Sequence, residues 1–365
     1  MNTSPFVRID LGAIKANYAA LRTLAPRTEI AGVVKTDSYG LGAATIAPVL
    51  YEAGCRTFFT AHFEEALALR KTIPDGTIIP LNGLTPDTFD EALAHAITPM
   101  LNHLGAIHDW ATFARQKGRP LPALIHIDTG MNRLGLPQDE LDILAADHAL
   151  LDGINVLAWI SHFARSEEFD SPMTPQQRDR MIQAVARLPK ARVSLCNSSG
   201  LYWGPEYQFD LARPGIALYG GNPTPNKPNP LQNVVELCAP ILQIHNAPQG
   251  TTVGYGATFT LTRPSRIAVL AMGYADGYRR SLRNQGTALI DGHPAPVIGG
   301  ISMDLITLDV TDIPERALTL GAPATLYGPH RPIDQAATEA GTISYELLTA
   351  LGPRVQRIYA GPQRA

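Results

Sequence analysis

Short polar segments follow several apolar runs in the first 220 residues of this 365-residue chain, and they hold the side chains best suited to chemistry. Lys35 directly follows the apolar run Ile30–Val34, where a structural lysine is costly because burial disfavours the ammonium form. Burial also lowers the pKa of a lysine and frees its amine for Schiff-base formation. Lys35 is therefore a candidate nucleophile, and an ordinary surface lysine at a strand end is the alternative.

Other polar segments hold groups that suit anions. The guanidinium of Arg133 can bind a carboxylate or a phosphate through two donors, although an exposed arginine in a helix-capping loop is the alternative. The segment Cys196–Gly200 supplies small hydroxyl groups and free N–H groups before a possible helix, which is typical of a phosphate site. His162 and Arg213, each taken alone, are more often structural. Together, however, these polar groups follow five of the predicted strands, which belong to one predicted barrel. Purely structural roles for all of them are harder to accept, so the set favours a binding site.

Alternating short apolar and longer amphipathic segments predict the scaffold that positions these groups. The expected strands are Phe6–Leu11, Ile30–Val34, Arg56–Thr60, Thr77–Leu81, Thr98–Leu101, Ala123–Asp128, Ile154–Ser161 and Arg192–Leu195, and Asp210–Tyr219 is expected to form one more strand with its following turn. The expected helices are one with Leu11, Ile14, Tyr18 and Leu21 on a single face, then Ala43–Ala53, Glu64–Thr72, Asp87–His95, Ile107–Lys117, Gln138–His148 and Pro175–Leu188. About eight strand–helix repeats predict an α/β barrel of the (β/α)₈ TIM-like type, with catalytic groups at the carboxyl ends of its strands. A doubly wound sheet is the alternative, and the absence of a Gly-x-Gly-x-x-Gly turn after the first strand disfavours it.

The character of the sequence changes after Gly220. Residues 221–230 contain four prolines and three asparagines, which indicates a linker. Strand patterns then dominate, at Val234–His245, Arg266–Met272, Thr287–Ile290, Leu305–Val310 and Ala324–Tyr327, and helical patterns return at Ile333–Ala340 and Ser344–Ala350. The sequence therefore predicts a barrel over residues 1–230 and a mostly β-strand domain over residues 231–365.

Bulk composition excludes several classes of protein. Hydrophobic residues make up 45% of the chain and charged residues 17%, which indicates a folded globular protein. A net charge of −3 gives no reason to expect nucleic acid or a membrane as a partner. The N-terminus lacks a signal-peptide pattern, and the scattered residues Cys55, Cys196 and Cys238 have no metal-ligand spacing. We therefore expect a cytoplasmic protein without a bound metal.

Seven segments, in order along almost the whole chain, resemble the alanine racemases, which belong to the fold-type III enzymes that use pyridoxal 5'-phosphate (PLP). They are Val34–Gly40, Ile127–Gly135, Ser161–Phe163, Arg213–Gly220, Gly254–Phe259, Gly273–Tyr278 and Ser302–Asp304. Any one of them could occur by chance, whereas seven in order are a specific signal.

The resemblance implies how PLP is held. Lys35 would bind it covalently, and the full set of cofactor contacts would be Lys35, Tyr39, His162, Asn197, Ser198, Arg213, Gly215 and Ile216. Tyr39, Ser198 and the N–H groups of Gly215 and Ile216 would bind the phosphate, and Arg213 would face the pyridine nitrogen. Because an arginine cannot accept a proton, that nitrogen would stay unprotonated and the carbanion would be short-lived, which suits racemisation.

The resemblance also implies a reaction with two bases on opposite faces of Cα. Lys35 would take the proton from D-alanine and Tyr255 from L-alanine, while Arg133 and Met303 bind the substrate. Tyr255 and Met303 would enter from a partner chain, so the active form would be a homodimer with shared sites. Supporting roles would fall to Asp304, Tyr274, Arg280 and His126. The product would serve peptidoglycan synthesis, or the enzyme would allow D-alanine catabolism.

One position departs from the family pattern. Many relatives carry a lysine in place of His126, and that lysine can be carbamylated to steady the arginine that corresponds to Arg133. A histidine cannot form this carbamate, so we hypothesise that a bound anion lies between His126 and Arg133.

Three other functions share part of this pattern. A broad-specificity or serine racemase would have the same core motifs, but the expected cytoplasmic location favours alanine. A fold-type III decarboxylase is disfavoured by Tyr255 and Arg213, and a barrel-only PLP-binding protein would lack the second domain.

Overall fold

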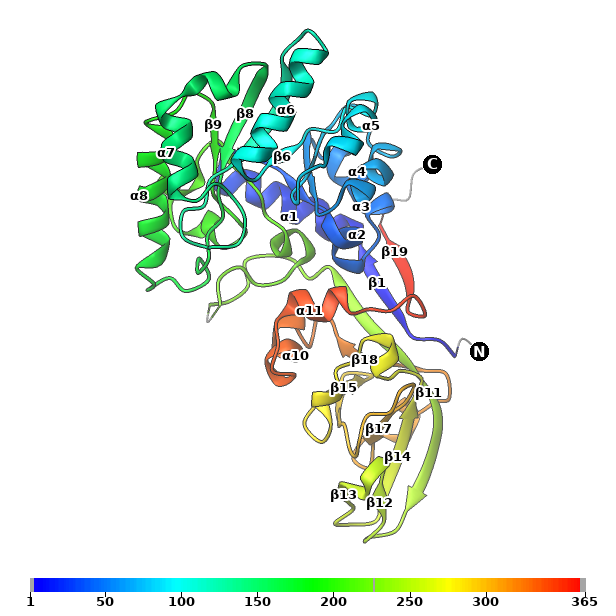
Figure 1. The fold of residues 1–365 in the computed structure, drawn as a ribbon. Coiled ribbons are helices and arrows are strands. Elements are labelled where there is room, and N and C mark those ends of the chain that lie inside the picture. The colour runs from blue at the N-terminus through cyan, green and yellow to red at the C-terminus, as the bar shows by residue number, and fades with distance from the viewer. Residues whose placement is uncertain (1–2, 226, 362–365) are drawn as a thin grey trace.

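The computed structural model describes residues 3–225 and 227–361, and it shows a barrel domain joined to a second, elongated β domain (Figure 1). The barrel strands are β2 (Glu29–Ile30), β3 (Gly32–Val33), β4 (Thr57–Thr60), β5 (Thr77–Pro80), β6 (Met100–Leu101), β7 (Leu121–His126), β8 (Ile154–Ile160), β9 (Arg192–Ser194) and β10 (Leu211–Ala212). If β2 and β3 are counted as one interrupted strand, these make the eight parallel strands of the predicted barrel. A parallel bridge joins Ile78 of β5 to Ile97, which lies just before β6. Strand β10 pairs with β2 and so closes the ring.

Helices surround the barrel because each buries one apolar face against it. They are α1 (Leu11–Leu24), α3 (Ala43–Glu52), α4 (Phe63–Arg70), α5 (Phe89–Ala94), α6 (Leu104–Gln116), α7 (Gln138–Ala146) and α8 (Met173–Val185), with the short α9 (Pro205–Gln208) before β10. All four apolar residues predicted to share one face of α1 are buried, and Asp10 caps this helix by accepting the N–H of Ala13 at 3.0 Å. None of the helices in the described ranges is long and apolar enough to cross a membrane.

The second domain is mostly β, as predicted. Its strands are β11 (Val235–Ala247), β12 (Thr252–Val253), β13 (Phe259–Thr260), β14 (Ser265–Leu270), β15 (Thr287–Ile290), β16 (His293–Pro296), β17 (Ile306–Asp309), β18 (Pro323–Tyr327) and β19 (Gln356–Ala360). The main sheet has the order β16-β15-β18-β11-β1-β19, and β14 and β17 extend from β11. Two helices, α10 (Ile333–Glu339) and α11 (Ser344–Thr349), lie between this sheet and the barrel (Figure 1).

The sequence-based placement of Phe6–Leu11 as the first barrel strand is wrong. This segment forms β1 (Phe6–Asp10), which pairs antiparallel with β11 and parallel with β19 in the sheet of the second domain. Its alternation of buried Val7 and Ile9 with exposed Arg8 and Asp10 suits a sheet with one face in solvent. Barrel strands such as β4 are instead buried at every residue.

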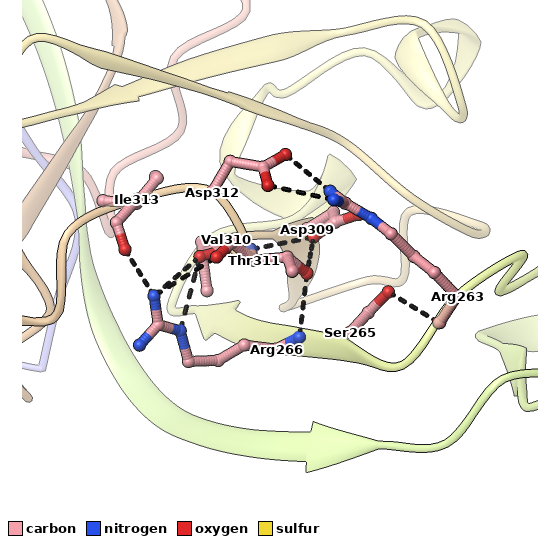
Figure 2. A network of polar contacts seen from close by, with 8 residues as sticks. All are labelled: Arg263, Ser265, Arg266, Asp309, Val310, Thr311, Asp312 and Ile313. Atoms are coloured by element: carbon pink, nitrogen blue, oxygen red, sulfur yellow. Dashed lines mark hydrogen bonds and ion pairs between the residues drawn. The ribbon is translucent and has the colours of Figure 1, made fainter.

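A polar network holds together the part of the second domain that lies away from the barrel (Figure 2). Arg266 donates through its guanidinium to the carbonyl oxygens of Val310, Thr311 and Ile313, and its N–H donates to the Thr311 hydroxyl at 2.9 Å. Arg263 forms a two-bonded ion pair with Asp312. These contacts hold the chain after β17 against the start of β14, well away from the barrel (Figure 1).

Candidate active site

A cavity of about 900 Å³ opens at the carboxyl ends of the barrel strands, where a (β/α)₈ enzyme places its active site. Every barrel residue that the sequence analysis selected lines it: Lys35, Tyr39, His126, Arg133, His162, Asn197, Ser198, Arg213, Gly215 and Ile216. Helices α10 and α11 of the second domain complete the wall. Segments that are distant in sequence therefore meet in one place, as predicted from the strand ends.

Lys35 opens a left-handed turn, α2 (Lys35–Gly40), which directly follows β3. Its residues Thr36, Asp37, Ser38 and Tyr39 have φ values of 54°, 52°, 53° and 59°. A left-handed conformation costs an L-residue about 1–2 kcal/mol, so the turn persists because other contacts hold it. The Glu65 carboxylate supplies one of these contacts by accepting the N–H of Thr36 at 2.8 Å, and it also accepts the N–H of Ala61 after β4 at 2.7 Å.

The surroundings of Lys35 favour the neutral amine. Burial lowers the pKa of Lys35, and the positive charges of Arg133 and Arg213 lower it further, while Glu65 acts in the opposite direction. A neutral amine is a nucleophile and a proton acceptor, whereas an ammonium ion is neither. The cavity therefore prepares Lys35 for both roles.

Arg213 lies buried at the centre of the barrel mouth. Its guanidinium donates to the Ser194 hydroxyl and to the carbonyl oxygen of Ser161, and it lies 3.3 Å from Nδ1 of His162. Burial lowers the pKa of Arg213 to about 10, so this side chain still carries its charge at neutral pH. Burial and the charge of Arg213 hold the pKa of His162 well below its ordinary value, which keeps that imidazole neutral.

A cradle for an anion lies beside these groups. Ser198 Oγ accepts the N–H groups of Gly215 at 3.0 Å and Ala217 at 3.3 Å, at the start of the 3₁₀ turn Ile216–Tyr219. A Cβ atom at Gly215 would lie 2.0 Å from the Tyr39 hydroxyl oxygen, so this close approach requires glycine. Hydroxyl and backbone N–H donors at the start of a helical turn are the donor set that a phosphate requires.

Asn197 lies next to Ser198 in the same segment, and its side chain forms two hydrogen bonds. Its Oδ1 accepts the Ser166 hydroxyl at 2.8 Å and the N–H of Gly200 at 2.9 Å. These bonds order the segment that carries Ser198, so Asn197 lines the cavity and also shapes the cradle.

A closed loop presents Arg133 to the cavity. The Asp128 carboxylate accepts the N–H groups of Gly130, Met131 and Asn132 at 2.8, 2.9 and 2.9 Å. The loop is pinned from behind by the buried Gln177, which donates to the carbonyl oxygen of His162 at 2.9 Å and to the Thr129 hydroxyl at 3.3 Å. The guanidinium therefore sits on a fixed loop that connects to the region around Arg213.

His126 is a neutral side chain in this site. Burial, followed by the charge of Arg213, lowers its pKa to about 4, and its Nδ1 lies 2.9 Å from Oδ1 of Asn102. Because Asn102 Oδ1 can only accept, Nδ1 carries the proton in this hydrogen bond. A neutral imidazole offers an anion no charge, so the hypothesised anion would depend on Arg133 and stays a prediction.

The second-domain residues selected from the sequence do not line the cavity of the same chain. Tyr255 is 79% exposed, Met303 54% and Tyr274 44%, and Arg280 is also exposed. The turn that begins with Tyr255 lies between β12 and β13, at the end of the molecule opposite the barrel (Figure 1). Asp304 bonds Arg354 at 2.8 Å, so within one chain it does not position Tyr255.

Backbone bonds join two of these segments into one surface. Tyr274 donates its N–H to the carbonyl oxygen of Ser302 at 3.1 Å, and Ala275 donates to that of Met303 at 3.0 Å. Asp276 closes the turn by accepting the N–H of Gly273 at 3.0 Å.

Tyr345 is one of the residues that line the cavity but were not selected in the sequence analysis. It lies at the start of α11, lines the cavity, and has its ring 5.8 Å from that of Tyr39. Nothing in the pattern Ile343–Glu346 distinguishes it from an ordinary helical residue, and the packing of α11 against α2 is what brings it to the site.

Comparisons with known proteins agree with this geometry. Residues 9–223 match the alanine racemase N-terminal domain family and residues 234–359 the alanine racemase C-terminal domain family. The chain is 50% identical over 355 residues to an alanine racemase of Acidiphilium cryptum, which covers 97% of this chain and 98% of the relative. It is 46% identical over 360 residues to a catabolic alanine racemase of Agrobacterium fabrum, with 98% and 93% covered.

A solved structure supports the same conclusion. The crystal structure of alanine racemase from Bartonella henselae with covalently bound pyridoxal phosphate superposes with a TM-score of 0.94 at 40% identity, covering 98% of this chain and 100% of that one. The barrel, the second domain and the cavity at their junction thus have a common origin with these enzymes, and the chain belongs to the alanine racemase family.

Proposed function

We propose that this chain interconverts L- and D-alanine by a two-base reaction in which Lys35 and Tyr255 act on opposite faces of Cα. Membership of the family makes the chain an isomerase that acts on amino acids and uses PLP. The observation that carries the detailed proposal is the convergence of Lys35, Arg133, Arg213 and the phosphate-type cradle on one cavity.

The residues present fit PLP. Arg133 and Arg213 place positive charges beside Lys35 in the inner cavity, and the donors near Ser198 and Gly215 suit a phosphate. When bound, PLP withdraws electrons from the Cα of an attached amino acid and so acidifies its hydrogen. Lys35 would hold the cofactor covalently, and Tyr39, Ser198 and the N–H groups of Gly215 and Ile216 would hold its phosphate.

Three side chains would bind the substrate, move its Cα proton and control the protonation of the cofactor ring. Arg133 on its pinned loop would bind the substrate carboxylate through two donors. Lys35 Nζ, whose pKa is lowered by burial and by two arginines, would accept the Cα proton of D-alanine. Arg213 cannot accept a proton, so it would leave a facing ring nitrogen unprotonated.

The second base would come from another copy of the chain. Tyr255 and Met303 lie on the exposed face of a domain that extends away from its own barrel (Figure 1). Tyr274 and Leu305 are also exposed there, at 44% and 40%, and large apolar side chains on a surface are typical of an interface. We infer a homodimer in which Tyr255 and Met303 of each chain complete the site of the other, with Asp304, Tyr274 and Arg280 near the entrance.

The test begins with purified protein, PLP and L-alanine, with D-alanine measured by chiral chromatography. Approach to an equal mixture, lost in both Lys35→Ala and Tyr255→Phe, is the expected result. Mixing the two inactive variants should then restore about a quarter of the wild-type activity, because half of the random dimers carry one intact site. Mixtures that stay inactive, although the chains exchange, would overturn the shared site.

Two further experiments address substrate and physiological role. Alanine should react much faster than serine or lysine, and a preference for either of these would indicate a different racemase. We place the enzyme in the cytoplasm, where its D-alanine would serve peptidoglycan synthesis or where D-alanine would be catabolised. A deletion strain that needs added D-alanine for growth supports the first role, and one that fails to grow on D-alanine as carbon source supports the second.

A further inference from the structure

The left-handed turn that begins at Lys35 is bonded at its far end to the last strand of the second domain. Arg357 on β19 donates to the carbonyl oxygen of Gly40 through Nε at 3.0 Å and through one terminal nitrogen at 2.9 Å. The same guanidinium also donates to the carbonyl oxygens of Leu351, Gly352 and Val355 at 2.8, 2.6 and 2.7 Å. One half-buried cation therefore joins the turn to the segment that follows α11.

A second residue of β19 contacts the turn just beyond Gly40. Tyr359 donates its hydroxyl to the carbonyl oxygen of Leu41 at 2.9 Å. A Cβ atom at Gly42 would lie 2.0 Å from this hydroxyl oxygen, and one at Gly40 would lie 2.8 Å from the carbonyl oxygen of Leu348 in α11. The chain after Lys35 is thus closely covered by β19 and α11, and β19 is itself held by its parallel pairing with β1.

We propose that Arg357 is a positioning residue for Lys35, and that β19 keeps the turn left-handed by bonding the carbonyl groups of Gly40 and Leu41. Four consecutive residues of the turn, Thr36–Tyr39, hold a conformation that they would leave if unrestrained. Glu65 restrains the turn at Thr36, and Arg357 restrains it at Gly40, so each end has a charged partner. The inference rests on the proposed function only in taking Lys35 as the residue that binds PLP.

The experiment compares Arg357→Met with a matched control in the full-length protein. Arg266 is also half-buried and donates through its guanidinium to three backbone carbonyls (Figure 2), whereas Arg357 donates to four. Arg266 lies far from the barrel, so Arg266→Met removes a comparable set of bonds at a distant place. Two quantities are measured: hydrogen–deuterium exchange in a peptide that covers residues 35–42, and the rate at which added PLP becomes attached to Lys35, followed by its absorbance.

The expected result is local to the turn. Arg357→Met should speed exchange in this peptide and slow PLP attachment, each by roughly ten- to a hundredfold, the effect of losing a charged hydrogen bond. Arg357→Lys should restore part of both, and Arg266→Met should change neither, even where it lowers the melting temperature. Equal behaviour of Arg357→Met and Arg266→Met in both measurements would overturn the proposal.

A milder variant covers the case in which Arg357→Met does not fold. Tyr359→Phe removes one hydroxyl and should give the same two effects with smaller size, and no change in either would overturn the proposal. Neither measurement uses alanine. Wild-type protein that attaches PLP at Lys35 but does not racemise alanine would therefore refute the proposed reaction and leave this inference standing.

Discussion

His126→Gln should remove part of the acid sensitivity of this protein. The folded chain holds His126 as a neutral side chain, because burial and the charges of Arg213 and Arg133 lower its pKa, and Asp128 only partly opposes them. In the unfolded chain the same imidazole has an ordinary pKa of about 6.5. Between these two values the unfolded state binds more protons, so the free energy of unfolding falls as the pH falls. Glutamine does not titrate and can still donate to Asn102.

The size of the effect follows from the two pKa values. The pKa of His126 is about 4 in the folded chain, which is about 2.5 below its value in the unfolded chain. This difference lowers the free energy of unfolding by about 3 kcal/mol when the pH falls from above both values to below both. Most of this change has occurred at about pH 4.5, where the free energy of unfolding is about 2 kcal/mol lower than at pH 7. His162 is neutral for the same reasons, but it is present in both proteins, so its contribution cancels in the comparison.

Urea unfolding at pH 7 and pH 4.5 measures the difference, with wild type and His126→Gln compared at equal protein concentration without PLP. Wild type should lose about 2 kcal/mol more than the variant between the two pH values. The variant's stability at pH 7 does not enter, because each protein serves as its own reference. An equal loss in both proteins would show that His126 is not buried as a neutral group, and the reasoning would fail.

Three further substitutions test the site at other points. Gly215→Ala places a methyl group against the Tyr39 hydroxyl, so we expect PLP to bind at least roughly tenfold more weakly by titration; unchanged affinity would contradict the cradle. Asp128→Asn weakens the three N–H bonds that close the loop of Arg133, so KM for alanine should rise roughly tenfold with a smaller change in kcat. Gln177→Leu breaks the link behind the same loop and should also raise KM; a loss confined to kcat would show that the loop keeps its position without it.

Local periodicity was sufficient to predict the barrel, because its helices are amphipathic and its strands are short, apolar and regularly spaced. It failed for Phe6–Leu11, where the pattern shows a strand but not its partner. That strand pairs with β11 and β19, which lie more than two hundred residues away, and only long-range packing selects them.

The candidate site was predictable as a set of residues but not as a geometry. Lys35, Arg133 and Arg213 could be chosen because a charged side chain that follows a buried apolar strand costs free energy unless it has a partner or a function. The left-handed turn after Lys35 has no comparable signal, since Thr36–Tyr39 includes no glycine to mark it. Tyr345, which lines the cavity, and Arg357, which bonds the turn after Lys35, were missed because each reaches the barrel only through the contact between the two domains.

The two arginines of the cavity would affect both anion binding and the reactivity of Lys35. Arg133 and Arg213 share with Lys35 a cavity in which two histidines are neutral, so the positive charge is concentrated on the two arginines, where an anionic cofactor and a substrate carboxylate would bind. The same two arginines lower the pKa of Lys35 and so favour the amine that attacks a carbonyl group or accepts a proton. A carboxylate in place of either arginine would oppose both effects at once, because it would repel the anion and stabilise the ammonium form. Burial is the largest cause of the lowered pKa of Lys35, and the choice of arginine at these two positions adds an electrostatic cause that would also favour anion binding.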